Sequence, residues 1–288
     1  MKTFTDTDQL REFVGRARRQ GKCVGLVPTM GALHQGHLSL IDRAREQCDV
    51  VIATIFVNPT QFAPGEDLAA YPRTPQEDSA ACESRGVDAL FMPPVEVMYP
   101  LEGSRTTVHV SELTEVLCGA RRPGHFDGVC LIVSKLFNLA QPDRAYFGEK
   151  DYQQLTVIRR MVSDLNFPIE IVGCPIVREP DGLAMSSRNA YLQPEQRVQA
   201  PELHASLTMA EEMIAERHPP AGQVVEAIRS YLQTRAPLGD IDYVKIANPR
   251  TLQDVQSTDQ PVLVALAVRF GRARLIDNIV VDSPVGNP

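Results

Sequence analysis

Two stretches decide the fold: residues 22–37, KCVGLVPTMGALHQGH, and residues 49–57, DVVIATIFV. Lys22–Pro28 predicts a short strand that is apolar on both faces, and Asp49–Val57 predicts a near-continuous apolar strand. Between them, apolar residues recur with helical spacing over His37–Cys48. Strands buried on both faces are typical of parallel sheets covered by helices. The order strand, turn, helix, strand therefore predicts a right-handed crossover.

The same alternation extends over residues 1–174. Periodicity predicts helices at 6–20, 75–85, 128–139 and 152–165, and strands at 88–92, 144–147 and 169–172. Such alternation predicts an α/β fold, a Rossmann-like doubly wound parallel sheet domain over residues 1–174. Ligands of such sheets bind beyond the carboxyl ends of the strands, where the segments after Pro28, Val57 and Phe147 lie.

The pattern changes after residue 174. Residues 194–235 predict two helices separated by Pro219-Pro220. The segments 242–246, 261–268 and 274–281 predict strands of a small antiparallel sheet. We therefore expect a smaller α+β C-terminal lid domain over residues 175–288.

Composition narrows the function classes. The chain has 288 residues, of which 43% are hydrophobic, so it can bury a sizeable core. No apolar run approaches the roughly 18 residues of a membrane span, and the N-terminus turns acidic where a signal peptide is apolar. The net charge of −7 and the lack of a long basic run argue against nucleic acid as a partner. Six cysteines without a CxxC pair predict buried thiols, and we expect a cytoplasmic protein that binds no membrane.

The turn Pro28–His37 carries the first chemical signal. Gly31 and Gly36 remove side chains where the backbone must approach a ligand closely. His34 and His37 are three residues apart near a helix N-terminus, so both can face phosphate oxygens. A plain glycine turn with two surface histidines remains an alternative, as does a zinc site, although HxxH lacks a nearby third ligand.

Three further segments follow strands or loops. Asn58 and Gln61 supply amides that bind hydroxyls and carboxylates without adding charge, although an ordinary Asn-Pro turn stays open. In the segment 147–154, Lys150 can reach a phosphate, and Asp151 can start a helix or bind ribose or magnesium. A capped helix with a surface lysine is the alternative there. In the segment 185–189, MSSRN, two hydroxyls and a guanidinium can clamp a phosphate, a signal that is weak by itself.

Taken together, these segments resemble the pantothenate synthetase (pantoate–β-alanine ligase) family. PTMGALHQGH, FVNPTQF, YPRT, GEKDYQQL and MSSRN match it in order and spacing over essentially the whole chain. HxGH alone marks the wider HIGH-motif nucleotidyltransferase superfamily, shared with class I aminoacyl-tRNA synthetases. The resemblance implies ATP-dependent condensation of (R)-pantoate with β-alanine, through a pantoyl adenylate, with release of pyrophosphate and AMP. It also implies Mg²⁺ and a homodimer formed through the first domain.

The resemblance also implies residue roles. His34, His37 and Lys150 are expected to be catalytic, with His37 the proton donor. Gln61 and Gln154 are expected to bind pantoate, Gln61 also β-alanine, and Asn58 belongs to this amide set. Residues 62–73 resemble the family's active-site gate, which would exclude water. The nucleotide is expected to contact Met30, Gly31, Ala32, Leu33, His34, Gln35, Gly36, His37, Gly148, Glu149, Lys150, Asp151, Val177, Met185, Ser186, Ser187 and Arg188, and no residue is assigned as a metal ligand.

Three other functions fit parts of the pattern. A different adenylyl or cytidylyl transferase would use the His34/His37 turn and MSSRN but would not need Asn58, Gln61 and Gln154. A tRNA-charging enzyme conflicts with the acidic charge, the length and the missing basic appendage. An inactive ATP-binding regulator would not need both histidines, Lys150 and the Ser-Ser-Arg clamp.

Overall fold

The computed structural model describes residues 1–101 and 105–282, and the chain forms two compact units. The first unit comprises Met1–Glu149 and Gln153–Pro175; the second comprises Lys150–Tyr152 and Ile176–Pro288. Lys150–Tyr152, which lie inside the first predicted domain, thus group with the second unit. Residues 283–288 of the second predicted domain lie outside the described residues.

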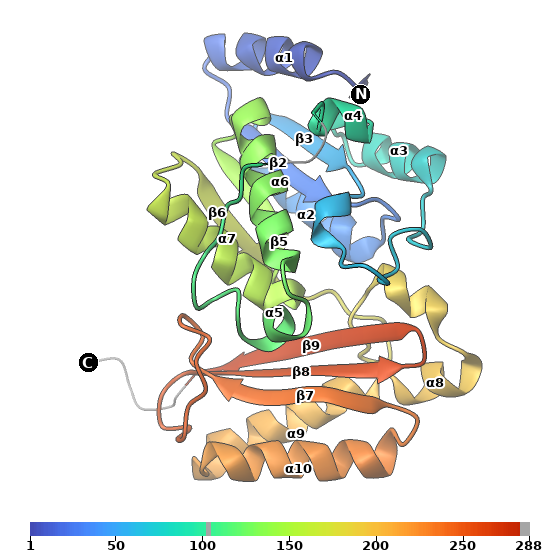
Figure 1. The fold of residues 1–288 in the computed structure, drawn as a ribbon, viewed down its shortest axis with the longest axis vertical. Coiled ribbons are helices and arrows are strands. Elements are labelled where there is room, and N and C mark those ends of the chain that lie inside the picture. The colour runs from blue at the N-terminus through green and yellow to red at the C-terminus, as the bar shows by residue number, and fades with distance from the viewer. Residues whose placement is uncertain (102–104, 283–288) are drawn as a thin grey trace. The chain divides into compact units, whose positions relative to one another are not determined.

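The first unit is built on one parallel sheet (Figure 1). The strand order is β1-β4-β3-β2-β5-β6, and each neighbouring pair is parallel. The strands are β1 (Lys2–Phe4), β2 (Val24–Thr29), β3 (Val50–Ile55), β4 (Ala89–Phe91), β5 (Arg144–Gly148) and β6 (Glu170–Cys174). The predicted doubly wound α/β fold is thereby confirmed.

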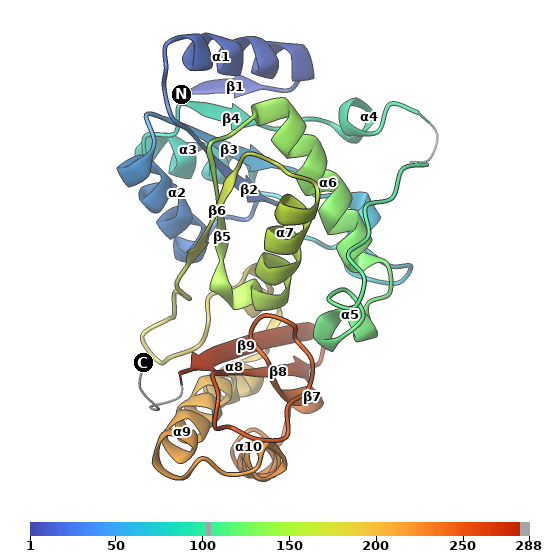
Figure 2. The same cartoon turned by 90° about the vertical axis from the view of Figure 1, so that its left-hand side faces the viewer.

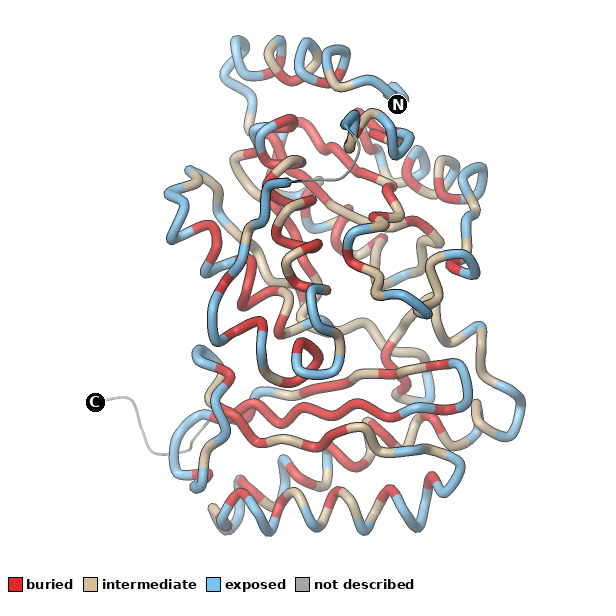
Figure 3. The backbone as a smooth tube through the Cα atoms, in the orientation of Figure 1, coloured by how far each residue is buried: buried red, intermediate tan, exposed pale blue. Residues whose placement is uncertain are grey.

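Helices cover both faces of this sheet, with α2 and α3 on one side and α6 and α7 on the other (Figure 2). The described helices of this part of the chain are α1 (Thr7–Arg19), α2 (Gln35–Gln47), α3 (Pro75–Ser84), α4 (Val95–Met98), α5 (Leu117–Arg121), α6 (His125–Ala140) and α7 (Tyr152–Asp164). Local sequence explains helix α1. The Asp6 carboxylate accepts hydrogen bonds from the Asp8 and Gln9 N–H groups at its start. Leu10, Val14 and Ala17 form its buried stripe. Burial is densest along the central strands and the inner helix faces (Figure 3).

The strand order reverses direction between β2 and β5. From β2 the chain proceeds outward to β3 and β4, whereas β5 and β6 extend the opposite side. β2 pairs with β3 along its whole length to Thr29, but it pairs with β5 at Gly25 and Leu26. The carboxyl-terminal halves of β2 and β5 therefore diverge, and a topological switch point of this kind is where ligands of such sheets bind.

The second unit contains an antiparallel sheet in the order β7-β8-β9, with helices α9 and α10 packed on one face of it (Figure 1). Its elements are α8 (Pro194–Gln199), α9 (Glu202–Arg217), α10 (Ala221–Arg235), β7 (Asp240–Ala247), β8 (Val262–Phe270) and β9 (Ala273–Val281). Side chains from both layers, among them Leu207, Ile228 and Leu266, form its buried core.

Several details differ from the sequence expectation, among them the following. Residues 194–235 form three helices rather than two, because Pro201 starts a new helix after the short α8. The strand β1 was not predicted; it has three residues and is ordered by pairing with β4. Helix α2 begins at Gln35, two residues before the predicted start, because His34 acts as its N-cap residue.

Candidate active site

The chain leaves β2 at Thr29 and turns sharply. Gly31 has a φ of +84° and Ala32 a φ of +51°, so two successive residues are left-handed. A Cβ at Gly31 would lie 2.9 Å from Ile55 Cγ2 and 3.0 Å from Asp78 Oδ2, closer than side chains tolerate. Both the positive φ and the lack of space therefore favour glycine at position 31.

His34 and His37 cap helix α2 reciprocally. His34 is the N-cap residue, and its Nδ1 accepts a hydrogen bond from the Gly36 backbone N–H at 3.1 Å. The Nδ1 of His37 accepts from the His34 backbone N–H at 3.3 Å, and the two ring centroids are 4.1 Å apart. The histidines thus take the place that Ser or Asp and Glu occupy in an ordinary capping box, which explains the early helix start.

This capping selects the tautomer of both rings. A neutral imidazole has one N–H donor and one acceptor nitrogen. Because Nδ1 of His34 and Nδ1 of His37 both accept, the proton of each neutral ring is on Nε2. The two imidazole rings therefore lie at the positive end of helix α2, each with an N–H on Nε2 when neutral, an arrangement suited to phosphate oxygens.

The amide segment follows β3, the strand next to β2. Asn58 is 1% exposed, and its Nδ2 donates to Gln61 Oε1 at 3.2 Å and to the Gly128 carbonyl at 3.1 Å. Its Oδ1 accepts from the Tyr99 hydroxyl at 2.8 Å and from Thr60 Oγ1 at 3.0 Å. All hydrogen-bonding groups of this amide are thus used inside the protein. Asn58 orients Gln61, a role that the sequence did not indicate.

Gln61 lies where several elements meet. Its Nε2 donates to Met30 Sδ at 2.8 Å, which joins the amide segment to the histidine turn. Its backbone carbonyl lies 2.7 Å from His125 Nδ1 and accepts from Arg122 Nη2 at 3.3 Å. Arg122 also forms a two-pronged ion pair with Glu66 of the predicted gate segment, at 2.7 Å on both sides. Burial of Glu66 raises its pKa, but the Arg122 hydrogen bonds outweigh burial and keep the pKa below its usual value.

Helix α6 lies directly against this amide segment. A Cβ at Gly128 would lie 2.3 Å from the Thr60 carbonyl oxygen and 2.7 Å from Gln61 Cα. Helix and segment can therefore approach this closely because residue 128 has no side chain.

The two glutamines at the start of α7 have different surroundings. Gln153 is buried; its Oε1 accepts from the Cys118 N–H at 2.9 Å, and its Nε2 donates to the Leu113 and Val116 carbonyls. Gln154 is partly exposed. The amide of Gln153 is thus used by the backbone around α5, and the expectation that at most one of this pair faces the substrate stays a prediction.

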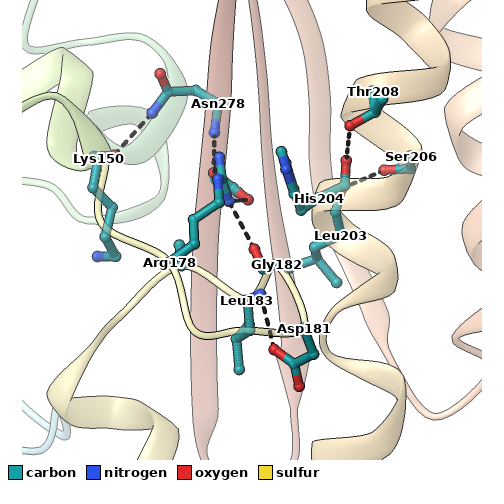
Figure 4. A network of polar contacts seen from close by, with 12 residues as sticks. Lys150, Arg178, Asp181, Gly182, Leu183, Leu203, His204, Ser206, Thr208 and Asn278 are labelled. Atoms are coloured by element: carbon teal, nitrogen blue, oxygen red, sulfur yellow. Dashed lines mark hydrogen bonds and ion pairs between the residues drawn. The ribbon is translucent and has the colours of Figure 1, made fainter. Parts of the chain in front are cut away.

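The second unit holds the remaining candidates. Lys150 Nζ lies 3.6 Å from the carboxylate of Asp151. The backbone carbonyl of Lys150 accepts from Asn278 Nδ2 at 2.9 Å, and Asn278 is a buried residue of β9 (Figure 4). The turn that carries the lysine is thus tied to a strand 128 residues further along the chain.

A residue of β9 holds the loop before MSSRN. Asp277, 3% exposed, pairs with Arg178 through contacts of 2.6 and 3.0 Å, and Arg178 also donates to the Gly182 carbonyl (Figure 4). The Met185 N–H donates to the Val177 carbonyl at 3.0 Å, so these two candidates are adjacent.

At the end of that loop, Ser186 caps a short 3-10 helix by accepting the Arg188 N–H at 3.3 Å. The 3-10 helix spans Ser187–Tyr191, so the predicted clamp residues occupy its first turn.

The candidates thus fall into two sets. The first unit carries Met30–His37, Asn58, Gln61, Gly148, Glu149 and Gln154, and the second carries Lys150, Asp151, Val177 and Met185–Arg188. Asp78, Tyr99, Arg122, His125 and Asn278 support these candidates and were not found from the sequence. None of them belongs to one of the motifs on which the sequence prediction rested, and the YPRT motif, which ends four positions before Asp78, is the nearest signal for any of them.

Two structural absences bear on ligands. Among the described residues, no three His, Cys, Asp or Glu side chains are grouped so that they could hold a metal ion. In the same part of the chain, no helix is both long enough and apolar enough to cross a membrane.

Comparison with known proteins agrees with this architecture. The family model described as pantoate-beta-alanine ligase matches residues 2–280. The chain is 56% identical over 273 residues to the pantothenate synthetase of Moorella thermoacetica, covering 95% of this chain and 96% of that one. It is 51% identical over 284 residues to the pantothenate synthetase of Syntrophomonas wolfei, covering 98% and 100%.

Solved structures of the same family are also similar to the chain. The pantothenate synthetase of Thermus thermophilus superimposes with a TM-score of 0.91 at 48% identity, covering 97% of this chain and 99% of that one. The pantoate-beta-alanine ligase of Francisella tularensis, solved as a complex with beta-gamma ATP and beta-alanine, gives a TM-score of 0.79 at 34% identity, covering 97% of each chain. The chain described here belongs to the pantoate-beta-alanine ligase family.

Proposed function

We propose that this protein is an ATP-dependent ligase that condenses (R)-pantoate with β-alanine to pantothenate. Membership of the pantoate-beta-alanine ligase family supports the overall reaction, and the Francisella tularensis relative is a complex with two of the three substrates. The structural observation that carries the proposal is the pair of histidines whose Nδ1 atoms both accept backbone hydrogen bonds. Each neutral ring then carries its N–H on Nε2, at a helix N-terminus.

The first step activates the acid. A carboxylate oxygen of pantoate attacks the α-phosphorus of ATP, the bond to the bridging oxygen breaks, and pyrophosphate leaves with the bonding electrons. Negative charge grows on the phosphate oxygens, and the Nε2–H groups of His34 and His37 stabilise it. We assign His37 as the donor of a hydrogen bond to the oxygen of the leaving pyrophosphate and Lys150 as a point charge on the phosphates. The product, pantoyl adenylate, carries AMP as a stable leaving group.

The side-chain amides of glutamine residues are proposed to select the acid substrate. We propose that Gln61 and Gln154 bind pantoate and that Gln61 also contacts β-alanine. Asn58 acts on this site through Gln61, since its own amide is hydrogen-bonded inside the protein. In the second step the amine of β-alanine attacks the acyl carbon, the bond to AMP breaks, and the amine loses a proton.

Contacts to the nucleotide are proposed for both sets of residues. From the first unit these are the turn Met30–His37 together with Gly148 and Glu149. Within that turn the N–H groups of Ala32 and Leu33 donate to Asp78, so these two residues would meet ATP through other atoms. From the second unit we propose Lys150, Asp151, Val177, Met185, Ser186, Ser187 and Arg188.

We propose Mg²⁺ as the cation that accompanies ATP. Mg²⁺ is usually bound by one or two carboxylates together with substrate phosphates and water. Asp151 would be one such carboxylate, since its side chain is exposed and lies beside Lys150. When bound, the ion would neutralise charge on the phosphates.

A homodimer through the first unit and a cytoplasmic location are also proposed. The family resemblance supports the dimer, which light scattering after size-exclusion chromatography would test. Six cysteines that are all free thiols, five of them buried, support a reducing compartment. We further propose that residues 62–73 act as a gate that keeps water from the adenylate.

The decisive experiment is ATP–pyrophosphate exchange with pantoate present and β-alanine absent. Exchange that depends on pantoate is expected; its absence would favour another adenylyl or cytidylyl transferase. His37→Ala is expected to slow exchange by about 10²–10³, the usual cost of losing one transition-state donor. Exchange at the wild-type rate in that variant would remove His37 from the proposed role.

A further inference from the structure

Asp78 is a buried carboxylate that faces the histidine turn from another element. It lies in the first turn of α3 and is 2% exposed. Its Oδ2 accepts from the Ala32 N–H at 2.9 Å, and its Oδ1 accepts from the Leu33 N–H at 2.7 Å. Each carboxylate oxygen therefore binds one of two successive amides just before the His34 cap.

The burial of this side chain is energetically costly. A carboxylate removed from water loses several kcal/mol of solvation, which protein sites usually offset with a cation. Within residues 1–101 and 105–282, no Lys, Arg or His lies within salt-bridge distance of Asp78. The two backbone amides and the first turn of α3 are what stabilise its charge. A residue kept at this cost is expected to maintain a specific local geometry.

The turn beside it needs such support. Ala32 has a φ of +51°, a conformation that costs an L-residue roughly 1–2 kcal/mol, and Gly31 is also left-handed. Two charge-assisted hydrogen bonds to the carboxylate are strong enough to offset that cost. The turn they stabilise leads directly into His34, whose ring direction depends on where the helix begins.

We propose that Asp78 is a positioning residue that sets the direction of the two imidazoles by fixing the turn at Ala32 and Leu33. The inference rests on the proposed function, because it assigns the imidazoles to phosphate. It also assigns the N–H groups of Ala32 and Leu33 to the protein rather than to the ligand. Phosphate recognition at this turn therefore depends on the side chains of His34 and His37.

Asp78→Asn is the most informative substitution. Asparagine has nearly the same shape, but it has one acceptor oxygen and one NH₂ group. One of the two amides would then face a donor instead of an acceptor. We expect the turn to shift and pantoate-dependent pyrophosphate exchange to slow by about 10- to 10²-fold, the range for a catalytic group displaced by about 1 Å. The KM for pantoate is expected to change less than the rate, because Gln61 and Gln154 lie on other segments.

Glu77→Gln is the matched control. Glu77 precedes Asp78 on α3 and is exposed, so the same change of carboxylate to amide removes a charge without touching the turn. Its exchange rate and thermal midpoint should equal those of the wild type. A wild-type exchange rate in Asp78→Asn would overturn the proposal. A loss of thermal stability in Asp78→Asn without a loss of rate at room temperature would also overturn it.

NMR tests the same inference without kinetics. In the wild type, ¹⁵N spectra should show both His34 and His37 as neutral rings with the proton on Nε2, and the Ala32 and Leu33 amide protons at low field. In Asp78→Asn those amide signals should move upfield and the tautomer ratio of His34 should change. Should Asp78→Asn not fold, the wild-type spectrum decides alone: a proton on Nδ1 of either ring refutes the proposed geometry. If wild-type exchange does not depend on pantoate, the proposed function fails, while the NMR result still tests Asp78.

Discussion

Gly128→Ala should disturb the amide site, although it adds only one methyl group. The added Cβ would lie 2.3 Å from the Thr60 carbonyl oxygen, whereas real Cβ contacts remain beyond 3.0 Å. Helix α6 and the segment Pro59–Gln61 must therefore separate by at least 3.0 − 2.3 = 0.7 Å along this direction. Both colliding groups are backbone, so no side chain can rotate to relieve the contact. Overpacking of this kind costs roughly 1–3 kcal/mol of stability.

The displacement also acts on the proposed chemistry. It stretches the hydrogen bond from Asn58 Nδ2 to the Gly128 carbonyl, now 3.1 Å, and it moves Gln61 relative to Met30. A shift of about 1 Å at a substrate-positioning residue can cost roughly 10²-fold in rate. We expect kcat/KM for pantoate to fall by about 10- to 10²-fold, with a smaller change in the KM for ATP.

Steady-state kinetics with each substrate varied, together with urea unfolding, test this reasoning. Gly222→Ala is the control, because residue 222 is an exposed position of α10 where a Cβ would meet nothing within 4 Å. That variant should be fully active and as stable as the wild type or slightly more stable, since alanine favours helices over glycine by about 0.5–1 kcal/mol. Unchanged pantoate kinetics in Gly128→Ala would show that the close approach of α6 does not determine the position of Gln61.

Three other substitutions test separate parts of the structure. Gln154→Ala should mainly raise the KM for pantoate; a change confined to the KM for ATP would contradict the assignment of that amide. Asn278→Ala removes the hydrogen bond to the Lys150 carbonyl, so we expect a several-fold higher KM for ATP and a loss of about 1 kcal/mol in urea unfolding; equal ATP kinetics would show that the lysine turn does not need this bond. Burial, followed by the charge of Arg178, lowers the pKa of His204 below its usual value of about 6.5. The unfolded chain therefore takes up a proton that the folded chain resists, and stability should fall as the pH drops below about 6.5. His204→Gln should lose less stability than the wild type between about pH 7.5 and about pH 5.5, and identical losses would exclude His204 as a source of acid sensitivity.

Local patterns were sufficient for much of this protein. Helices and strands of the first unit can be recognised from periodicity, because burial on one or both faces dictates which positions are apolar. The apolar strand at 50–55 and the amphipathic helix at 7–19 were therefore predicted within two residues at each end. The histidine turn and the amides at Asn58 and Gln61 were visible for a similar reason, since each follows directly after a predicted strand.

The polar residues that hold the candidate site in place could not be predicted from the periodicity of the sequence. Asp78 binds amides that lie 45 and 46 positions earlier in the chain, and Asn278 binds a carbonyl 128 positions away. Such hydrogen bonds leave no periodic signature, because the distant partner of a polar side chain does not affect the spacing of the apolar residues around it. The early start of α2 was missed for a related reason: histidine is seldom a cap, and its capping role depends on the orientation of its ring.

The order of residues is enough to establish that the chain alternates strands and helices, that a glycine turn with two histidines follows one strand, and that amides follow another. Tertiary contacts establish that β2 and β5 diverge at the switch point, that Asn58 faces the protein, and that Lys150 groups with the second unit. They also establish that Nδ1 of His34 and Nδ1 of His37 face backbone N–H groups. The physical reason is the same throughout: local burial repeats along the chain and can be read from it, whereas a hydrogen bond between distant residues exists only once the fold has brought its two partners together.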